Sequence, residues 1–170
     1  MNRRPEDTEY ASFYGGYIAR VPETEVLPVL ESQIAEVRAL AEAAAEKETF
    51  RYAPGKWSVR EMIGHLTDAE RVFGFRAFCF SRGEEAALPG FEENQYVAAS
   101  GYDAVDLASL VREWTLVREG NIEVLRRLPE EAWSKTGTAS GWPISVRALA
   151  YAMAGHVRHH RAILRERYGI

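Results

Sequence analysis

Four histidines are the residues of this sequence that could bind a metal ion, and three of them fall within five positions, 156–160. Residues four apart in an α-helix lie about 40° apart on one face. His156 and His160 have this spacing, whereas His159 lies about 60° to the side. Their stripe is otherwise apolar: Leu149, Ala152, Met153 and Ile163. The spacing predicts that His156 and His160 face the interior and that His159 lies at its boundary.

The fourth histidine, His65, also lies on an apolar helical stripe, which carries Met62, Ala69 and Val72. Three buried imidazoles without partners would cost about 1–3 kcal/mol for each unsatisfied group. One metal ion would satisfy all three, because neutral imidazole nitrogen is a common metal ligand. Each histidine could instead be a core residue with its own hydrogen-bond partner, and the residue pattern leaves both interpretations open.

The elements that must position these histidines are long amphipathic helices. A capping box of Ser58 and Glu61 opens the second, and Ser145 is the expected N-cap of the fourth. A long loop, 81–102, follows the second helix and is long enough to be functional. Apolar residues at steps of three and four predict helices over 23–48, 59–80, 106–128 and 146–168. Four such helices and almost no β alternation predict an all-α four-helix bundle.

Length and composition predict one soluble domain. We expect residues 1–22 to be an irregular segment that packs on the body and residues 23–170 to form the bundle domain. A net charge of −4 disfavours nucleic acid as a partner. The single cysteine, Cys79, excludes an intramolecular disulfide and a thiolate zinc cluster. No stretch is apolar enough to span a membrane, so we expect a cytoplasmic protein.

Two segments resemble the signatures of the DinB-like superfamily, also called YfiT-like metalloproteins. Residues 57–70, WSVREMIGHLTDAE, resemble its second-helix signature, and residues 156–163, HVRHHRAI, resemble the HxxxH signature of its fourth helix. The resemblance covers the chain from about Thr24 to the C-terminus. It implies an up-down-down-up four-helix bundle that holds one divalent metal through His65, His156 and His160. Zinc or nickel would be the first choice of metal, with iron or copper as alternatives.

Other polar residues near the three histidines are candidates for supporting roles. Glu61 and Asp68 could orient His65 by hydrogen bonding, although Glu61 is already explained as a capping partner. His159 matches no ligand position of the family and is either a supporting residue or solvated. Cys79 is expected to be a small core residue rather than a nucleophile. The sequence also contains aromatic residues that could floor a pocket or fill the core: Trp133, Trp142 and Tyr151.

Three histidine ligands leave coordination positions open, which is typical of a catalytic site. Because relatives implied by the resemblance include thiol-dependent transferases, the first hypothesis is activation of a low-molecular-weight thiol for S-transfer to an electrophile. The alternative is a hydrolase that uses metal-bound water. A non-catalytic metal-binding protein, related to stress or to interactions, is the third possibility. The expected partners are a small-molecule substrate and a second copy in a homodimer; no organic cofactor and no catalytic side chain is assigned.

Overall fold

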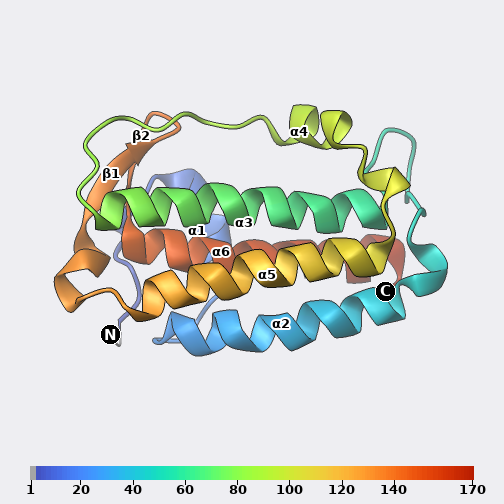
Figure 1. Ribbon diagram of the computed structural model, residues 1–170, viewed down its shortest axis with the longest axis horizontal. Coiled ribbons are helices and arrows are strands. Elements are labelled where there is room, and N and C mark those ends of the chain that lie inside the picture. Colours follow the sequence, from blue (N-terminus) through green and yellow to red (C-terminus); the bar gives the residue numbers. More distant parts are fainter. Residues whose placement is uncertain (1–2) are drawn as a thin grey trace.

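The computed structural model describes residues 3–170, and four long helices run side by side through it (Figure 1). Helices α2 and α6 point in one direction and α3 and α5 in the other, so that α3 and α5 are parallel neighbours. This order is up, down, down, up, and it confirms the predicted all-α fold class. The four helices are α2 Val26–Ala43, α3 Val59–Ser81, α5 Leu107–Arg126 and α6 Val146–Ile163.

Side chains at the helix starts explain where the long helices begin. The capping box predicted for α3 is present, because Ser58 accepts from the Glu61 amide while Glu61 accepts from the Ser58 amide. Ser145 caps α6 as predicted by accepting from the Ala148 amide. Helix α6 ends earlier than expected, and a π-helical turn, Leu164–Tyr168, continues it to Gly169.

The connection between α3 and α5 is a long crossover that returns along the bundle, and for this reason the two helices are parallel (Figure 1). The sequence predicted an irregular loop over 81–102. The structure instead places a short helix, α4 Glu93–Ser100, and a 3₁₀ turn, Tyr102–Ala104, in and directly after it. Helix α4 buries one residue, Val97, so its sequence carries almost no amphipathic pattern that could have predicted it.

The connection between α5 and α6 contains a β-hairpin that the sequence did not predict. Strands β1 Thr136–Ala139 and β2 Trp142–Ser145 pair antiparallel after a 3₁₀ turn, Glu130–Ser134. Each strand has only four residues, too few for a clear alternation of apolar and polar side chains. The hairpin ends directly at the N-cap of α6 and so joins α6 to the end of α3, where Gly137 lies against Phe80.

Short elements at both ends of the first long helix complete the structure. The N-terminal segment contains 3₁₀ turns Asp7–Glu9 and Ser12–Tyr14 and the single-turn helix α1 Gly15–Ile18, which packs on α6. Its side chains Tyr14 and Ile18 are buried. Another 3₁₀ turn, Ala45–Lys47, follows α2.

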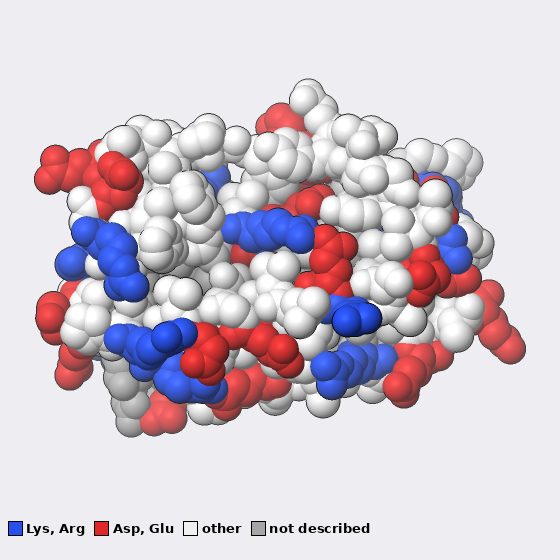
Figure 2. Space-filling view, viewed as in Figure 1, with Lys and Arg blue, Asp and Glu red and all other residues white. Residues whose placement is uncertain are grey.

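The surface carries charges of both signs. Figure 2 shows Lys and Arg side chains interspersed with Asp and Glu on the face presented there. The part of the chain described by the structure contains no helix with the length and hydropathy needed to cross a membrane.

Candidate metal centre

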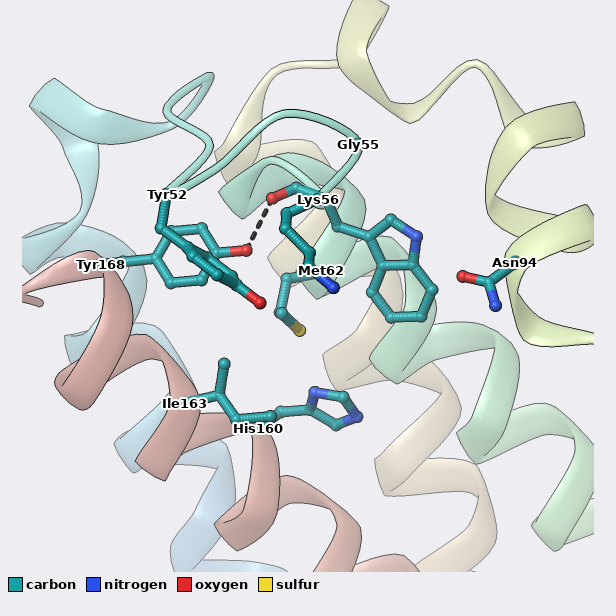
Figure 3. A pocket seen from close by; sticks show the side chains of 9 residues that line it. Tyr52, Gly55, Lys56, Met62, Asn94, His160, Ile163 and Tyr168 are labelled. Atoms are coloured by element: carbon teal, nitrogen blue, oxygen red, sulfur yellow. Dashed lines mark hydrogen bonds between the residues drawn. The ribbon is translucent and has the colours of Figure 1, made fainter.

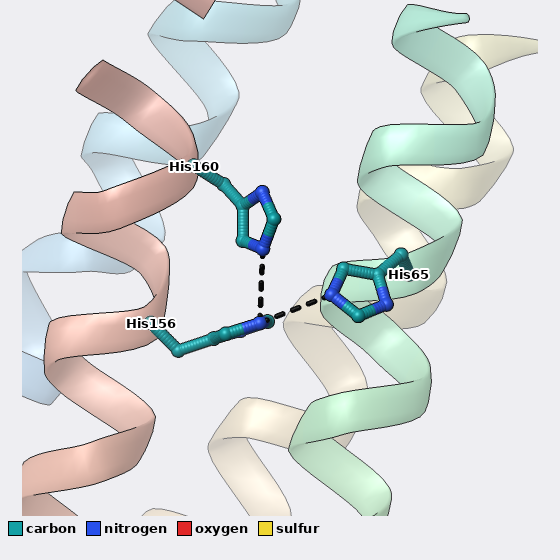
Figure 4. Close-up of side chains that lie close together, drawn as sticks. All are labelled: His65, His156 and His160. Carbon is teal, nitrogen blue, oxygen red and sulfur yellow. Dashed lines mark hydrogen bonds between the residues drawn. The ribbon is translucent and has the colours of Figure 1, made fainter. Parts of the chain in front are cut away.

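Three histidine side chains from two helices converge in the interior of the bundle (Figure 4). The Nε2 atom of His156 lies 3.0 Å from Nε2 of His65 and 3.0 Å from Nε2 of His160. Possible ligand atoms of all three lie within 4.8 Å of one another, and the three residues are 1%, 4% and 6% exposed in chain order. We call His65, His156 and His160 the histidine triad.

Helix geometry explains why these three residues meet. His156 and His160 are one turn apart on the face of α6 that is packed against α3. Helix α3 runs antiparallel to α6, so His65 arrives opposite this pair from the other side of the interface. The tertiary structure therefore brings together residues 91 positions apart in the sequence.

Hydrogen bonding among the three rings does not by itself account for their arrangement. The Nε2 atom of an imidazole has either one proton or one in-plane lone pair. His156 Nε2 can therefore make only one good in-plane hydrogen bond, yet it faces two Nε2 atoms at 3.0 Å. A divalent metal ion would accept all three lone pairs at once, and the triad fits such an ion in ligand type and in burial.

Burial keeps the triad in the protonation state that a metal requires. Desolvation, with a smaller contribution from the charge of His159, lowers the pKa of His65 to about 4. Desolvation also lowers the pKa of His156 and of His160 well below the usual value. Neutral imidazoles present free nitrogen lone pairs at neutral pH, which is the form that coordinates metal ions.

Aromatic rings enclose the triad on several sides, and the histidine pattern did not predict them. The ring centroid of Trp57 lies 4.6 Å from that of His65. Tyr17 and Phe73 approach His156 edge-on, with centroids 5.3 Å and 5.9 Å away. These rings give the triad a largely aromatic surrounding. Tyr17 comes from the N-terminal segment, where no helical periodicity indicated a contact.

The residues considered for supporting roles make other contacts. Glu61 accepts from the Ser58 amide at 2.8 Å and pairs with Arg51. Asp68 accepts from the Tyr102 hydroxyl at 2.7 Å. Both carboxylates are thus engaged away from the triad, and Nδ1 of His65 and of His160 have no hydrogen-bond partner within residues 3–170.

His159 is adjacent to the triad but differs from it in position. Its side chain is half-buried, and its ring meets Tyr17 edge-on at a centroid distance of 5.4 Å and His160 at 5.0 Å. The group of side chains close enough together to share one metal ion consists of His65, His156 and His160 and does not include His159. This is the boundary position that helical spacing predicted.

The remaining candidate residues lie elsewhere in the fold. Cys79 is half-buried against the core, and burial raises the pKa of its thiol, which disfavours a reactive thiolate. Trp133 and Tyr151 are buried core residues, and the Tyr151 hydroxyl donates to backbone carbonyls of Glu23 and Thr24. Trp142 is 56% exposed on the hairpin.

Two cavities reach the triad from different sides. One, of about 200 Å³, is lined by His160, Met62 and Trp57 and by residues of the loop that follows α2 (Figure 3). In Figure 3 the side chains of Lys56 and Met62 extend into the space above His160. The second, of about 170 Å³, is lined by His156 and by residues of α1, α3 and the α3–α5 connection.

A buried polar network holds the four helices together beside the triad. Arg118 of α5 donates two hydrogen bonds to Glu70 of α3, at 2.9 and 2.7 Å, and one to Gln33 of α2 at 2.7 Å. Gln33 in turn donates to the carbonyl of Ala154 in α6 at 2.8 Å, two residues before His156. The charge of Arg118 also contributes to the lowered pKa of His156.

These features define a class: an up-down-down-up helical bundle with a buried three-histidine centre suited to a divalent metal. A family model described as the DinB superfamily matches residues 29–164, so the chain belongs to the DinB superfamily.

Comparison with solved structures identifies a protein of similar fold. The fold is similar to that of YfiT from Bacillus subtilis, described as a probable metal-dependent hydrolase with an unusual four-helix bundle topology. The TM-score is 0.75 at 18% identity, and the match covers 99% of this chain and 94% of YfiT. No curated protein matches the sequence.

Proposed function

We propose that the protein is a metal-dependent enzyme in which His65, His156 and His160 bind one divalent transition metal, zinc or nickel first. One observation carries this proposal: His156 Nε2 faces two other Nε2 atoms at 3.0 Å, an arrangement that hydrogen bonds cannot fully satisfy. The description of YfiT as a probable metal-dependent hydrolase supports the same reading.

We favour hydrolysis of a small molecule as the reaction. A divalent metal held by three nitrogens has open positions and lowers the pKa of a bound water to about 7, which supplies a nucleophile. Around this centre Trp57, Tyr17 and Phe73 form aromatic walls, and the two cavities that they line give a small molecule access to the triad. Lys56, in the cavity above His160, is placed to contact a substrate that enters there.

Transfer of a low-molecular-weight thiol to an electrophile is the reaction first expected from the sequence resemblance. The same open positions would accept a thiol and favour its deprotonation. Because no feature of the cavities selects a thiol, we rank it after hydrolysis. A cytoplasmic enzyme acting on small molecules, as a monomer or a homodimer, remains part of the proposal.

Metal content and activity test the proposal with a matched pair of variants. Protein produced without an affinity tag is expected to contain about one divalent metal per chain. His156→Ala should lose this metal, whereas His159→Ala, an adjacent histidine outside the triad, should retain it. A wild-type protein without stoichiometric metal, or equal loss in both variants, would contradict the metal centre.

Activity assays on the same metal-containing protein distinguish between the possible reactions. We expect metal-dependent hydrolysis of small esters or amides that needs no added thiol. Metal-dependent conjugation of a thiol to a chloro-nitroaromatic, without hydrolysis, would favour the transferase instead. Metal-loaded protein that neither hydrolyses these esters and amides nor conjugates the thiol would favour a non-catalytic metal-binding role.

A further inference from the structure

Arg76 of α3 is a buried cation that differs from the other buried arginines, because within residues 3–170 it has no carboxylate partner. Three arginines are 3% exposed or less within residues 3–170: Arg76, Arg118 and Arg147. Arg118 pairs with Glu70 and Arg147 with Glu9, both at 2.7 Å. In the same described part of the chain no carboxylate oxygen lies within 4.0 Å of the Arg76 guanidinium.

The hydrogen-bond partners of the Arg76 guanidinium among the described residues are all neutral oxygen atoms. It donates to the Tyr14 hydroxyl at 3.2 Å, to the Pro89 carbonyl at 2.7 Å and to the Ser140 hydroxyl at 2.9 Å. Burial lowers the pKa of Arg76, yet an arginine stays charged in proteins. A buried charge without an opposite charge is costly, so this position favours an incoming anion.

The two hydroxyls that accept hydrogen bonds from Arg76 have their own protons available to donate to a ligand. Tyr14 and Ser140 use oxygen lone pairs to accept from the guanidinium, and neither hydroxyl donates to an acceptor elsewhere in residues 3–170. Burial raises the pKa of Tyr14, which keeps its proton on the oxygen. The guanidinium and both hydroxyl protons therefore offer hydrogen bonds to the same ligand, and a ligand that accepts all of them is an anion.

This cationic group lies in the 170 Å³ cavity that also reaches the triad. Arg76, Tyr14, Ser140 and His156 all line it. Several of its other lining residues are aromatic, with Phe73 and Phe91 among them. Glu93 lines it too, but its side chain is exposed and its charge is screened by water more than that of Arg76.

The backbone at Ser140 is set by the turn of the hairpin, in which Ser140 and Gly141 both have a positive φ. Its φ of +54° is the left-handed conformation, and no other non-glycine residue in 3–170 has a positive φ. A two-residue type I′ hairpin turn requires a positive φ at both of its residues, so the turn by itself accounts for this conformation. A glycine would adopt this turn with less strain but would remove the hydroxyl next to Arg76.

We propose that Arg76, Tyr14 and Ser140 bind the carboxylate of a small molecule whose apolar body lies along the aromatic walls toward His156. A carboxylate fits better than a phosphate dianion, because one guanidinium supplies one positive charge. The carboxylate site stands on its own geometry; only its role in presenting a substrate to the triad rests on the proposed function.

Binding of benzoate to the full chain tests the site, with benzamide as the neutral control of the same shape. We expect benzoate, but not benzamide, to raise the melting temperature and to shift NMR signals of His156, in metal-loaded and in metal-free protein. Ser140→Gly and Tyr14→Phe should each weaken benzoate binding about tenfold, equivalent to ~1.4 kcal/mol. Arg82→Gln removes an exposed charge just beyond the end of α3 and should leave binding unchanged.

The variants separate binding from a purely structural role. If Arg76 only connects the loops to α3, loss of the Ser140 hydroxyl should not affect benzoate binding. A Ser140→Gly protein that binds benzoate as tightly as wild type would therefore overturn the proposal. Equal responses to benzoate and benzamide, or equal losses in Arg82→Gln and Ser140→Gly, also overturn it. A failed metal centre would show as absent metal while metal-free protein still binds benzoate, so the two proposals fail separately.

Discussion

At the scale of single residues, the most costly interaction to disturb is the ion pair between Glu70 and Arg118. Their side chains are 2% and 0% exposed, and Asn121 also donates to Glu70 at 2.9 Å. The Arg118 guanidinium lies 4.8 Å from the Trp114 ring centroid, so that a cation–π contact adds to the pair. Both charges are fully compensated, and removal of either leaves the other buried and unpaired.

We predict that Glu70→Leu and Arg118→Met each lower the free energy of unfolding by about 3–5 kcal/mol. The double variant Glu70→Leu/Arg118→Met should lose less than the sum of the single changes, because no unpaired charge remains. Urea denaturation of the four proteins measures this double-mutant cycle. Additive losses would show that the two charges do not act as a pair.

At the scale of elements, the packing of α1 on α6 depends on a glycine inside α6. A Cβ atom at Gly155 would lie 2.0 Å from the backbone carbonyl oxygen of Tyr17. Glycine within a helix normally costs 0.5–1 kcal/mol relative to alanine. At position 155 the close approach of the two backbones explains why glycine is present. The same close approach brings Tyr17 against His156, the residue after Gly155.

We predict that Gly155→Ala lowers stability by about 1–3 kcal/mol, because backbone rather than a flexible side chain must move. Gly120→Ala is the matched control in α5, since a Cβ atom there meets nothing within 4 Å and the residue is exposed. It should raise stability by up to about 1 kcal/mol. Thermal unfolding compares the two, and a stabilised Gly155→Ala protein would rule out the close α1–α6 packing.

At the scale of the whole molecule, the triad links α3 to α6, the pair of antiparallel helices that bring their histidines face to face. A metal bound there would bind the folded chain preferentially, because His65 is 91 positions from His156 and meets it only in the folded chain. Metal binding and global stability should therefore be coupled.

We predict that metal removal lowers the melting temperature. A metal present at about 100 times its Kd stabilises the fold by ~2.7 kcal/mol, or about 5–10 °C for a domain of this length. Dialysis against EDTA should remove this gain, and added zinc or nickel should restore it. In His65→Ala neither treatment should shift the melting temperature; an equal shift in that variant would place the metal elsewhere.

Local pattern was sufficient for the helices and for the inward direction of the histidines. The stripes, the Ser58–Glu61 box and the Ser145 cap depend on residues within one or two turns, so they can be read from neighbouring positions. Helix α4 and the β-hairpin could not be predicted in this way, because their short segments carry no repeating apolar pattern.

The sequence by itself determined four amphipathic helices, the buried direction of His65, His156 and His160, and the boundary position of His159. Only the tertiary structure decided that Tyr17 and Trp57 lie against the triad and that Arg76 meets no carboxylate among residues 3–170. The physical reason is the separation along the sequence of the residues that interact. Helix faces follow from spacing of a few residues, whereas the cavity is formed by backbone segments that meet only when the chain packs.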